Sequence, residues 1–260
     1  MDTAGLDFVE VTEVAGDPVS SEQLERVTHR YVWASKFCPD KDVAEIACGT
    51  GPGLGLLNRE SKTFEAADFS QPMLEKARAH YGDRIRLAQI DAQDMPYEDA
   101  SKDVLIILEA IYYLQDLKKF IDECRRVLRP GGTLLLATAN KDLPDFNPSP
   151  FSHRYLGASE LVAEFSAIRS EIELFGYLAV DEISGLQRSL RPIKRLAVNL
   201  GLMPRTMRGK RLLKRLVFGP PVRMPAEIIG ADIVYNEPTA LPLDKPDRRH
   251  KVIYCAIKLQ

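Results

Sequence analysis

The residues with the clearest chemical meaning lie where a short apolar run ends in alternating glycines. Gly49, Gly51 and Gly53 alternate, Pro52 lies between the last two, and Glu45 is the acid within the apolar run. Glycine permits positive φ and close approach of a ligand to the backbone, and proline suits a first helical turn. The backbone amides of such a turn can face an anionic group. The stretch therefore predicts a buried strand that turns sharply into a helix at a ligand site.

Two common nucleotide motifs share this turn. A nucleotide-triphosphate loop ends in Gly-Lys-Ser/Thr, whereas Gly53 is followed by Leu54-Gly55-Leu56, so that class of site is excluded. A dinucleotide fingerprint needs Gly-x-Gly-x-x-Gly, and leucine occupies its third glycine position from either starting glycine. A nicotinamide oxidoreductase therefore stays open only as an alternative.

Acidic residues follow the next two predicted strands. The segment 63–68 ends at Asp68, and the segment 85–90 is followed directly by Asp91. The carboxyl ends of parallel strands meet at one edge of a sheet, and open α/β sheets bind ligands there. We therefore expect both carboxylates to lie near the glycine turn. The alternative is that each is only a helix cap or turn residue.

Glu45, Ala47, Gly49 and Gly51 resemble the acidic-x-Gly-x-Gly-x-Gly motif of the class I S-adenosylmethionine-dependent methyltransferases, with Ala47 in place of the first glycine. Three further stretches match the family in the same order. They are residues 68–74, residues 91–96 and residues 126–132. The resemblance covers about residues 40–140 and implies S-adenosylmethionine as the cofactor.

The resemblance also implies roles for particular side chains. Asp68 is expected to accept hydrogen bonds from both ribose hydroxyls of the cofactor. Asp91 is expected to bind the adenine amino group, with the Ala92 amide on the ring nitrogen, and Asp94 is an alternative to Asp91. The residues predicted to bind the cofactor are Tyr31, Glu45, Ala47, Gly49, Gly51, Asp68, Phe69, Met73, Asp91, Ala92, Gln93, Leu108 and Glu109.

Methyl transfer from a sulfonium depends mainly on in-line positioning, because the cation is already a strong electrophile. A general base is needed only where an acceptor hydroxyl must lose its proton. The candidate catalytic residues are Glu109 and Tyr113 after the fourth predicted strand, with Tyr112 beside them, and His153 in a proline-rich loop. For His153 the alternative is an exposed structural histidine. The Asn/Asp-Pro-Pro-aromatic tetrad of family members that methylate adenine or glutamine amines does not occur at 109–112.

The remaining predicted elements position these residues. A helix capped by Ser20 or Ser21 and ending before Pro39 precedes the glycine strand. It is expected either to cover the core or to reach over the ligand as a lid, through Arg30, Tyr31 or Trp33. Strands are predicted at 43–47, 63–68, 85–90, 103–108, 133–138, 171–177 and 251–258, alternating with helices. The predicted fold is α/β: a Rossmann-like, seven-stranded, mostly parallel sheet with an antiparallel last strand, plus a basic helical cap insertion.

The insertion is predicted from charge. Residues 183–226 contain eleven Lys or Arg and no Asp or Glu, although the net charge of the whole chain is only −2. Two apolar faces within this segment predict basic amphipathic helices, which could close over an anionic substrate, make peripheral contact with an anionic membrane through residues 188–223, or be merely solvated. No nucleic-acid partner is expected, because no stacking motif accompanies the charge.

The chain is predicted to have one main domain with additions. Residues 1–38 form an N-terminal arm and lid helix, residues 39–180 the cofactor-binding core, residues 181–247 the basic insertion and residues 248–260 the last strand. A secretory signal and a membrane-spanning stretch are both lacking, which predicts a cytoplasmic location. Cys38, Cys48, Cys124 and Cys255 are scattered singly, so we expect reduced core thiols and no metal site.

The sequence thus predicts an enzyme that methylates a hydroxyl, or an amine, of a small anionic acceptor such as a phosphorylated or nucleotide-linked sugar. The second hypothesis is a quinone or lipid acceptor at a membrane surface. A non-catalytic cofactor-binding protein, or the nicotinamide oxidoreductase named above, is the alternative from another functional class.

Overall fold

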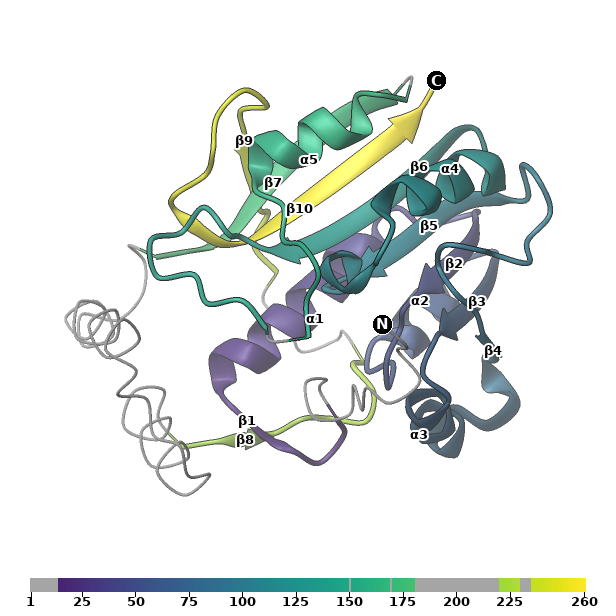
Figure 1. The fold of residues 1–260 in the computed structure, drawn as a ribbon. Coiled ribbons are helices and arrows are strands. Elements are labelled where there is room, and N and C mark those ends of the chain that lie inside the picture. Colours follow the sequence, from purple (N-terminus) through teal and green to yellow (C-terminus); the bar gives the residue numbers. More distant parts are fainter. Residues whose placement is uncertain (1–13, 150, 169, 181–219, 230–234) are drawn as a thin grey trace.

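A twisted, mostly parallel sheet forms the centre of the molecule (Figure 1). The computed structural model describes residues 14–149, 151–168, 170–180, 220–229 and 235–260. In this part of the chain the main sheet has eight strands. Their order across the sheet is β4 (Arg86–Gln89), β3 (Thr63–Asp68), β2 (Asp42–Ile46), β5 (Lys102–Leu108), β6 (Leu128–Ala139), β10 (His250–Leu259), β7 (Ser170–Ala179) and β9 (Thr239–Leu241).

The strand directions place the carboxyl ends of five parallel strands at one edge of the sheet. Strands β4, β3, β2, β5 and β6 are parallel neighbours, whereas β10 runs antiparallel to both β6 and β7. The predicted parallel sheet with an antiparallel last strand is therefore confirmed, but the predicted count of seven strands is wrong. Strand β9, placed by the sequence analysis in the insertion, pairs with β7 and adds an eighth strand at the edge. Its three residues lie between Pro238 and Pro242 and are too short to show a strand period.

Helices cover both faces of the sheet (Figure 1). They are α1 (Ser21–Ser35), α2 (Leu54–Glu60), α3 (Gln71–Tyr81), α4 (Leu117–Val127) and α5 (Ala158–Phe165), with 3₁₀ turns at Gly82–Arg84 (η3) and Ile111–Tyr113 (η4). Apolar side chains of α1 and α2 pack on one face, where Val27 and Leu57 share a cluster with Val43. On the other face, α4 and α5 bury Phe120 and Phe165. These layers fix the strand ends, and so the backbone around the glycine turn.

Helix starts follow local capping chemistry. The Ser20 hydroxyl accepts the Gln23 amide at 3.1 Å and caps α1, and Asp116 caps α4 by accepting the Lys119 amide at 3.1 Å. Ser70 precedes α3 but makes no side-chain cap bond. Its own amide donates to Asp68 instead, at 2.7 Å. The amide of the residue before α3 therefore serves the site rather than the helix.

Residues 220–229, which lie inside the predicted insertion, form an extended strap beside the glycine turn. Strand β8 (Val222–Arg223) pairs with β1 (Pro18–Val19), and further along the strap the Ile228 amide donates to the Pro52 carbonyl at 2.7 Å. The described end of the predicted helical insertion is therefore extended. The rest of the predicted basic helices, at 181–219, lies outside the described residues.

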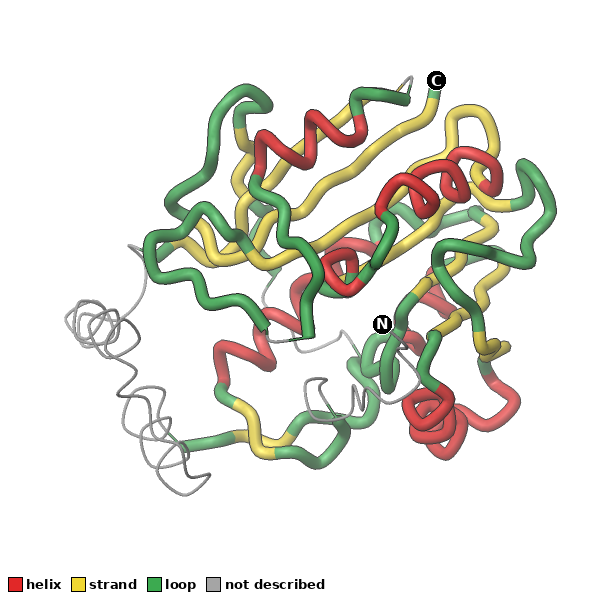
Figure 2. The backbone as a smooth tube through the Cα atoms, viewed as in Figure 1, coloured by secondary structure: helices red, strands yellow, loops and turns green. Residues whose placement is uncertain are grey.

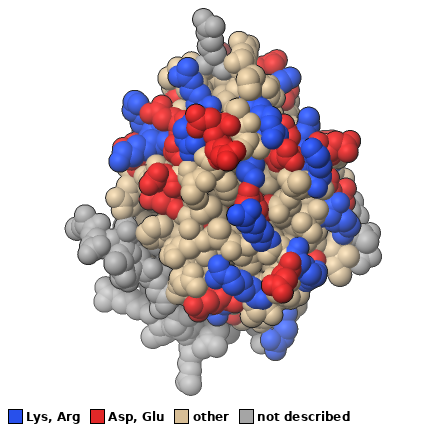
Figure 3. All heavy atoms as spheres, turned by 90° about the vertical axis from the view of Figure 1, so that its right-hand side faces the viewer, with Lys and Arg blue, Asp and Glu red and all other residues tan. Residues whose placement is uncertain are grey.

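The surface charges and the buried cysteines are those of an ordinary globular protein. On the face drawn in Figure 3, acidic and basic side chains are interspersed over the described surface. All four cysteines are buried and free, as predicted. Figure 2 shows the predicted proline-rich connection between β6 and α5 as a loop, drawn in green. Among the helices described, none is long and apolar enough to cross a membrane.

Candidate functional site

The carboxyl ends of β2, β3, β4 and β5 surround one cavity of about 360 Å³. Every residue predicted to bind the cofactor lines this cavity except Gly51. Helix α1 adds Arg26, Arg30 and Tyr31 to the wall, and the turn after β5 adds Tyr112 and Tyr113. The acids that the sequence placed at separate strand ends therefore face a common space.

The glycine turn is held in left-handed backbone. Ala47, Gly49 and Gly51 have φ values of 57°, 60° and 70°, respectively. Ala47 stands where the family motif has glycine, and a side chain in this conformation costs about 1 kcal/mol. Gly51 does not reach the cavity because it shapes the turn itself. Its carbonyl accepts the Tyr81 hydroxyl at 2.6 Å.

Gly53 makes room for Tyr31 rather than for a ligand. A Cβ atom at Gly53 would lie 2.0 Å from the Tyr31 ring. The ring can therefore lie against the turn, and its hydroxyl donates to Oε1 of Glu45 at 2.9 Å. Tyr31 is 1% exposed, so its position is fixed by packing on both sides.

Glu45 is a buried carboxylate that faces the cavity. Its Oε2 atom has no hydrogen-bond partner among the described residues. Burial raises the pKa of Glu45 to about 8, and the nearby Asp68 charge adds to the rise, while the Tyr31 hydrogen bond and Arg30 oppose it. A positive charge close to Glu45 would favour its ionised form.

Asp68 is oriented by two backbone donors. The Gly49 amide donates to Oδ2 at 2.7 Å and the Ser70 amide to Oδ1 at 2.7 Å. Burial raises the pKa of Asp68, and the two amide bonds oppose that rise. Each carboxylate oxygen keeps acceptor capacity for a further donor, because a carboxylate can accept about four hydrogen bonds. Two hydroxyl groups of a ligand can therefore bind to it.

Asp91 begins a tight turn at the end of the cavity near β4. Its Oδ1 atom accepts the backbone amide of Gln93 at 2.9 Å and its side-chain amide at 3.0 Å. Asp94, the alternative acid, is exposed and does not line the cavity. Phe69, also on the wall, is 49% exposed, which is unusual for a phenylalanine. This end of the cavity offers an acid, a backbone amide and an open aromatic ring.

The other end of the cavity carries a charged cluster. Glu109, at φ 55°, accepts from Arg26 through Oε1 and from the Tyr112 hydroxyl through Oε2, both at 3.2 Å. The rings of Tyr112 and Tyr113 meet edge-on at 4.6 Å, and burial raises the pKa values of both hydroxyls. Arg26 was missed in the sequence, where its only signal is that it lies one helical turn before Arg30.

Helix α1 is fastened on the side away from the cavity. The His29 ring lies 2.9 Å from the Tyr254 hydroxyl and 2.7 Å from the Asn236 carbonyl, and it stacks on Tyr177. Burial lowers the pKa of His29 to about 4, so the ring is neutral. Trp33, one of the residues considered for a lid, is buried against Tyr254. The helix named as a lid therefore forms a packed wall in this structure.

His153 is not brought to the site. Its side chain is exposed and is not among the residues that line the cavity. Its backbone amide donates to the Tyr112 carbonyl at 2.8 Å, so the loop, not the imidazole, meets the site. The structure thus agrees with the alternative of an exposed loop histidine and gives no support to a base at this position.

Comparison with known proteins agrees with this geometry. Residues 44–136 match the family model of a methyltransferase domain. A probable S-adenosylmethionine-dependent methyltransferase of Mycolicibacterium smegmatis is 32% identical over 155 residues, 57% of this chain and 56% of that protein. The chain thus carries a methyltransferase domain and is similar to S-adenosylmethionine-dependent methyltransferases. It spans about half the length of the curated relatives it matches.

Two further similarities concern the core and the fold of this chain. A demethylmenaquinone methyltransferase of Clavibacter sepedonicus is 34% identical over 120 residues, 45% of this chain and 48% of that protein. The crystal structure of the YcgJ protein from Bacillus subtilis has a TM-score of 0.58 at 19% identity, covering 89% of this chain and 98% of that one. The second similarity shows a shared fold.

The residues that line the cavity fit S-adenosylmethionine. Glu45 places a buried carboxylate in the wall beside the glycine turn, and no partner for its Oε2 atom lies in the described part of the chain. Asp68 adds acceptors for hydroxyl groups, and Asp91 adds an acceptor at the far end. An amino acid joined to a nucleoside carries groups that complement these donors and acceptors.

Proposed function

We propose that this protein is an enzyme that transfers a methyl group from S-adenosylmethionine to an oxygen atom of a small acceptor that carries an anionic group. The observation that carries the proposal is the single cavity that joins the glycine turn, Asp68, Asp91 and the buried carboxylate of Glu45. When bound, the cofactor supplies an electrophilic methyl group.

In this proposal each cavity residue has a defined task toward the cofactor. Glu45 interacts with the ammonium group, since it places a negative charge in the cavity wall beside the glycine turn. Asp68 accepts from the ribose hydroxyls with the oxygens that Gly49 and Ser70 orient. Asp91 and the Ala92 amide bind the adenine, which excludes water from that end of the cavity.

The opposite end is assigned to the acceptor. Arg26 and Arg30 line the cavity there and favour an anionic group, because guanidinium groups bind carboxylate and phosphate oxygens well. Glu109 accepts a proton from an acceptor hydroxyl, and its contacts with Arg26 and Tyr112 fix the direction of its oxygens. Tyr113 borders the same space and orients the acceptor.

Titration calorimetry with S-adenosylhomocysteine and with NAD tests the cofactor. We expect binding of S-adenosylhomocysteine and none of NAD, and the reverse result would overturn the proposal in favour of an oxidoreductase. The acceptor is then sought with methyl-labelled cofactor and a panel of anionic metabolites, each paired with its neutral analogue. Label found only in carbon-methylated or nitrogen-methylated products would contradict the choice of oxygen.

A quinone acceptor is the second candidate, favoured by the similarity to the demethylmenaquinone methyltransferase of Clavibacter sepedonicus. Peripheral membrane contact through residues 188–223 belongs to this candidate. Sedimentation with anionic vesicles tests it, comparing the native chain with a variant whose charges are reversed at Lys210, Arg211, Lys214 and Arg215. Binding that is lost in the variant, together with methylation of a demethylquinone, would favour the quinone over the small anionic acceptor.

A further inference from the structure

The loop between β4 and β5 carries part of the cavity wall far from the glycine turn. Residues 90–101 connect these strands, and Asp91, Ala92 and Gln93 line the cavity. In the proposed function this is the adenine-binding loop. The loop has no helix or strand of its own beyond a single bridge between Asp91 and Asp94, so its shape depends on what holds it.

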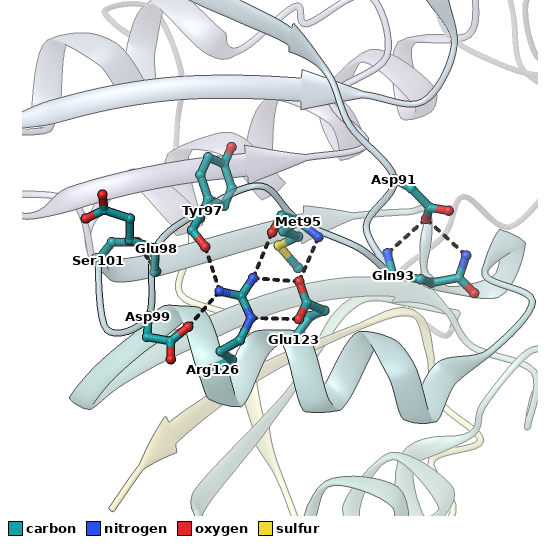
Figure 4. A network of polar contacts seen from close by, with 9 residues as sticks. All are labelled: Asp91, Gln93, Met95, Tyr97, Glu98, Asp99, Ser101, Glu123 and Arg126. Carbon is teal, nitrogen blue, oxygen red and sulfur yellow. Dashed lines mark hydrogen bonds and ion pairs between the residues drawn. The ribbon is translucent and has the colours of Figure 1, made fainter.

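Arg126 on α4 holds the middle of this loop (Figure 4). Its guanidinium donates to the backbone carbonyl oxygens of Met95 at 2.7 Å and Tyr97 at 2.6 Å. It also donates to the carboxylate of Asp99 at 2.8 Å. The two carbonyl bonds determine the loop backbone directly, whereas the Asp99 side chain is 79% exposed and adds little.

Glu123, one turn earlier on α4, binds both Arg126 and the loop. It accepts Nε and Nη2 of Arg126, both at 2.8 Å, and its Oε2 atom accepts the Met95 amide at 2.7 Å. Met95 is thus bound through both its amide and its carbonyl, and its side chain is buried. The paired, bidentate geometry is the strong form of a carboxylate–guanidinium contact.

The start of α4 holds the same loop from its other side. The amide of Asp116, the residue that caps α4, donates to Oε1 of Gln93 at 2.7 Å, and Gln93 in turn donates twice to Asp91 (both bonds to Asp91 are drawn in Figure 4). Helix α4 therefore contacts the loop at two points, Gln93 and Met95. Because the helix is rigid over this length, the distance between these two contacts is fixed.

We propose that Arg126 and Glu123 are positioning residues for cofactor binding, which act by fixing the loop that carries Asp91 and Ala92. Neither side chain lines the cavity, so the effect is transmitted through Met95 and the turn closed by the Asp94 amide on the Asp91 carbonyl at 3.0 Å. The inference rests on the proposed function, because it assumes that the loop binds the cofactor.

The test is the affinity for S-adenosylhomocysteine, measured by calorimetry on the full chain. Arg126→Met is expected to raise the Kd about three- to thirtyfold, the range for residues that act on a site through others. Arg126→Lys keeps the positive charge but not the forked hydrogen-bond donors of the guanidinium. It should therefore recover part of the affinity that Arg126→Met loses. Arg125→Met is the matched control, since Arg125 is the exposed neighbour on the same helix, and its Kd should stay within about twofold of the native value.

A double-mutant cycle separates positioning from a general loss of stability. If Arg126 acts through Asp91, Arg126→Met should change the Kd little in a chain that already carries Asp91→Asn. Independent effects that multiply, or a native Kd in Arg126→Met, would overturn the inference. If Arg126→Met does not fold, Glu123→Gln enters the same cycle, with the same outcomes. A native chain that binds no S-adenosylhomocysteine would instead refute the proposed function.

Discussion

The Tyr31 hydroxyl donates a 2.9 Å hydrogen bond to Oε1 of Glu45 in the cavity wall, and no partner for the other oxygen of Glu45 lies among the residues that the structure describes. The pair joins α1 to the strand that begins the glycine turn. Burial raises the pKa of Glu45 to about 8. At neutral pH the folded protein without ligand therefore holds a proton on this carboxyl group, and a cationic ligand must displace it.

Binding of S-adenosylhomocysteine should consequently release a proton. At pH 7 we expect about one proton released per ligand bound, because the ammonium group favours the ionised carboxylate. The Kd should fall by up to about tenfold per unit as pH rises from 6 to 8. Calorimetry in buffers of different ionisation enthalpy measures the proton directly. A constant Kd with no proton release would show that Glu45 does not meet the ammonium group.

The Glu45→Gln variant tests the raised pKa of Glu45 in the absence of ligand. In the native chain the folded state keeps a proton that the unfolded state releases above pH 4.5, so the free energy of unfolding should fall as pH rises from 4.5 to about 8. Glutamine removes the titrating group, and urea unfolding of the variant should lose this component of the pH dependence. An unchanged slope in this window would contradict the assignment.

Asp68→Asn should weaken S-adenosylhomocysteine binding at least about tenfold, since a hydrogen bond to a charged acceptor contributes about 1.5–3 kcal/mol. Asparagine is preferred to alanine because its oxygen still accepts one of the two backbone amides that bind Asp68, whereas alanine would leave both unsatisfied. Asp94→Asn makes the same chemical change at an exposed acid outside the cavity and should bind normally. Native affinity in Asp68→Asn would refute the ribose assignment.

The sequence predicted the parts of the site that follow from strand ends. Asp68 and Asp91 could be placed together because a parallel sheet brings the carboxyl ends of its strands to one edge. The glycine turn and the last strand were likewise visible, since local backbone demands and a long apolar run leave a signal in sequence, whereas the antiparallel direction of that strand came from the family resemblance. These features depend on residues close together in the chain.

Features that depend on tertiary contacts were not predictable in this way. Arg26 reaches Glu109 across 83 positions of sequence, and no period or motif connects them. His153 was favoured by its loop, but the direction of a loop side chain is set by backbone bonds such as the one to Tyr112. Strand β9 forms because the edge of β7 is available for pairing, and its own three residues carry no strand signal.

Gly53→Ala should displace Tyr31, because the new Cβ atom would lie 2.0 Å from the ring. We expect a loss of about 1–3 kcal/mol in the free energy of unfolding, as for other overpacked sites. Affinity for S-adenosylhomocysteine should also fall, since Tyr31 lines the cavity. In a Tyr31→Ala chain the same substitution has room and should cost much less. Equal costs in the two backgrounds would rule out the ring as the cause.

Ala47→Gly should stabilise the protein, which is unusual for a glycine substitution. Ala47 has φ 57°, where a Cβ atom costs about 1 kcal/mol that glycine avoids, although glycine also gains freedom in the unfolded chain. The net gain should be about 0.5 kcal/mol in urea unfolding. Ala66→Gly, in the buried strand β3, should instead destabilise, because nothing there requires positive φ. A loss of stability in Ala47→Gly would mean that the methyl group's contacts in the cavity wall outweigh the backbone strain, and that the departure from the family's glycine is compensated by packing.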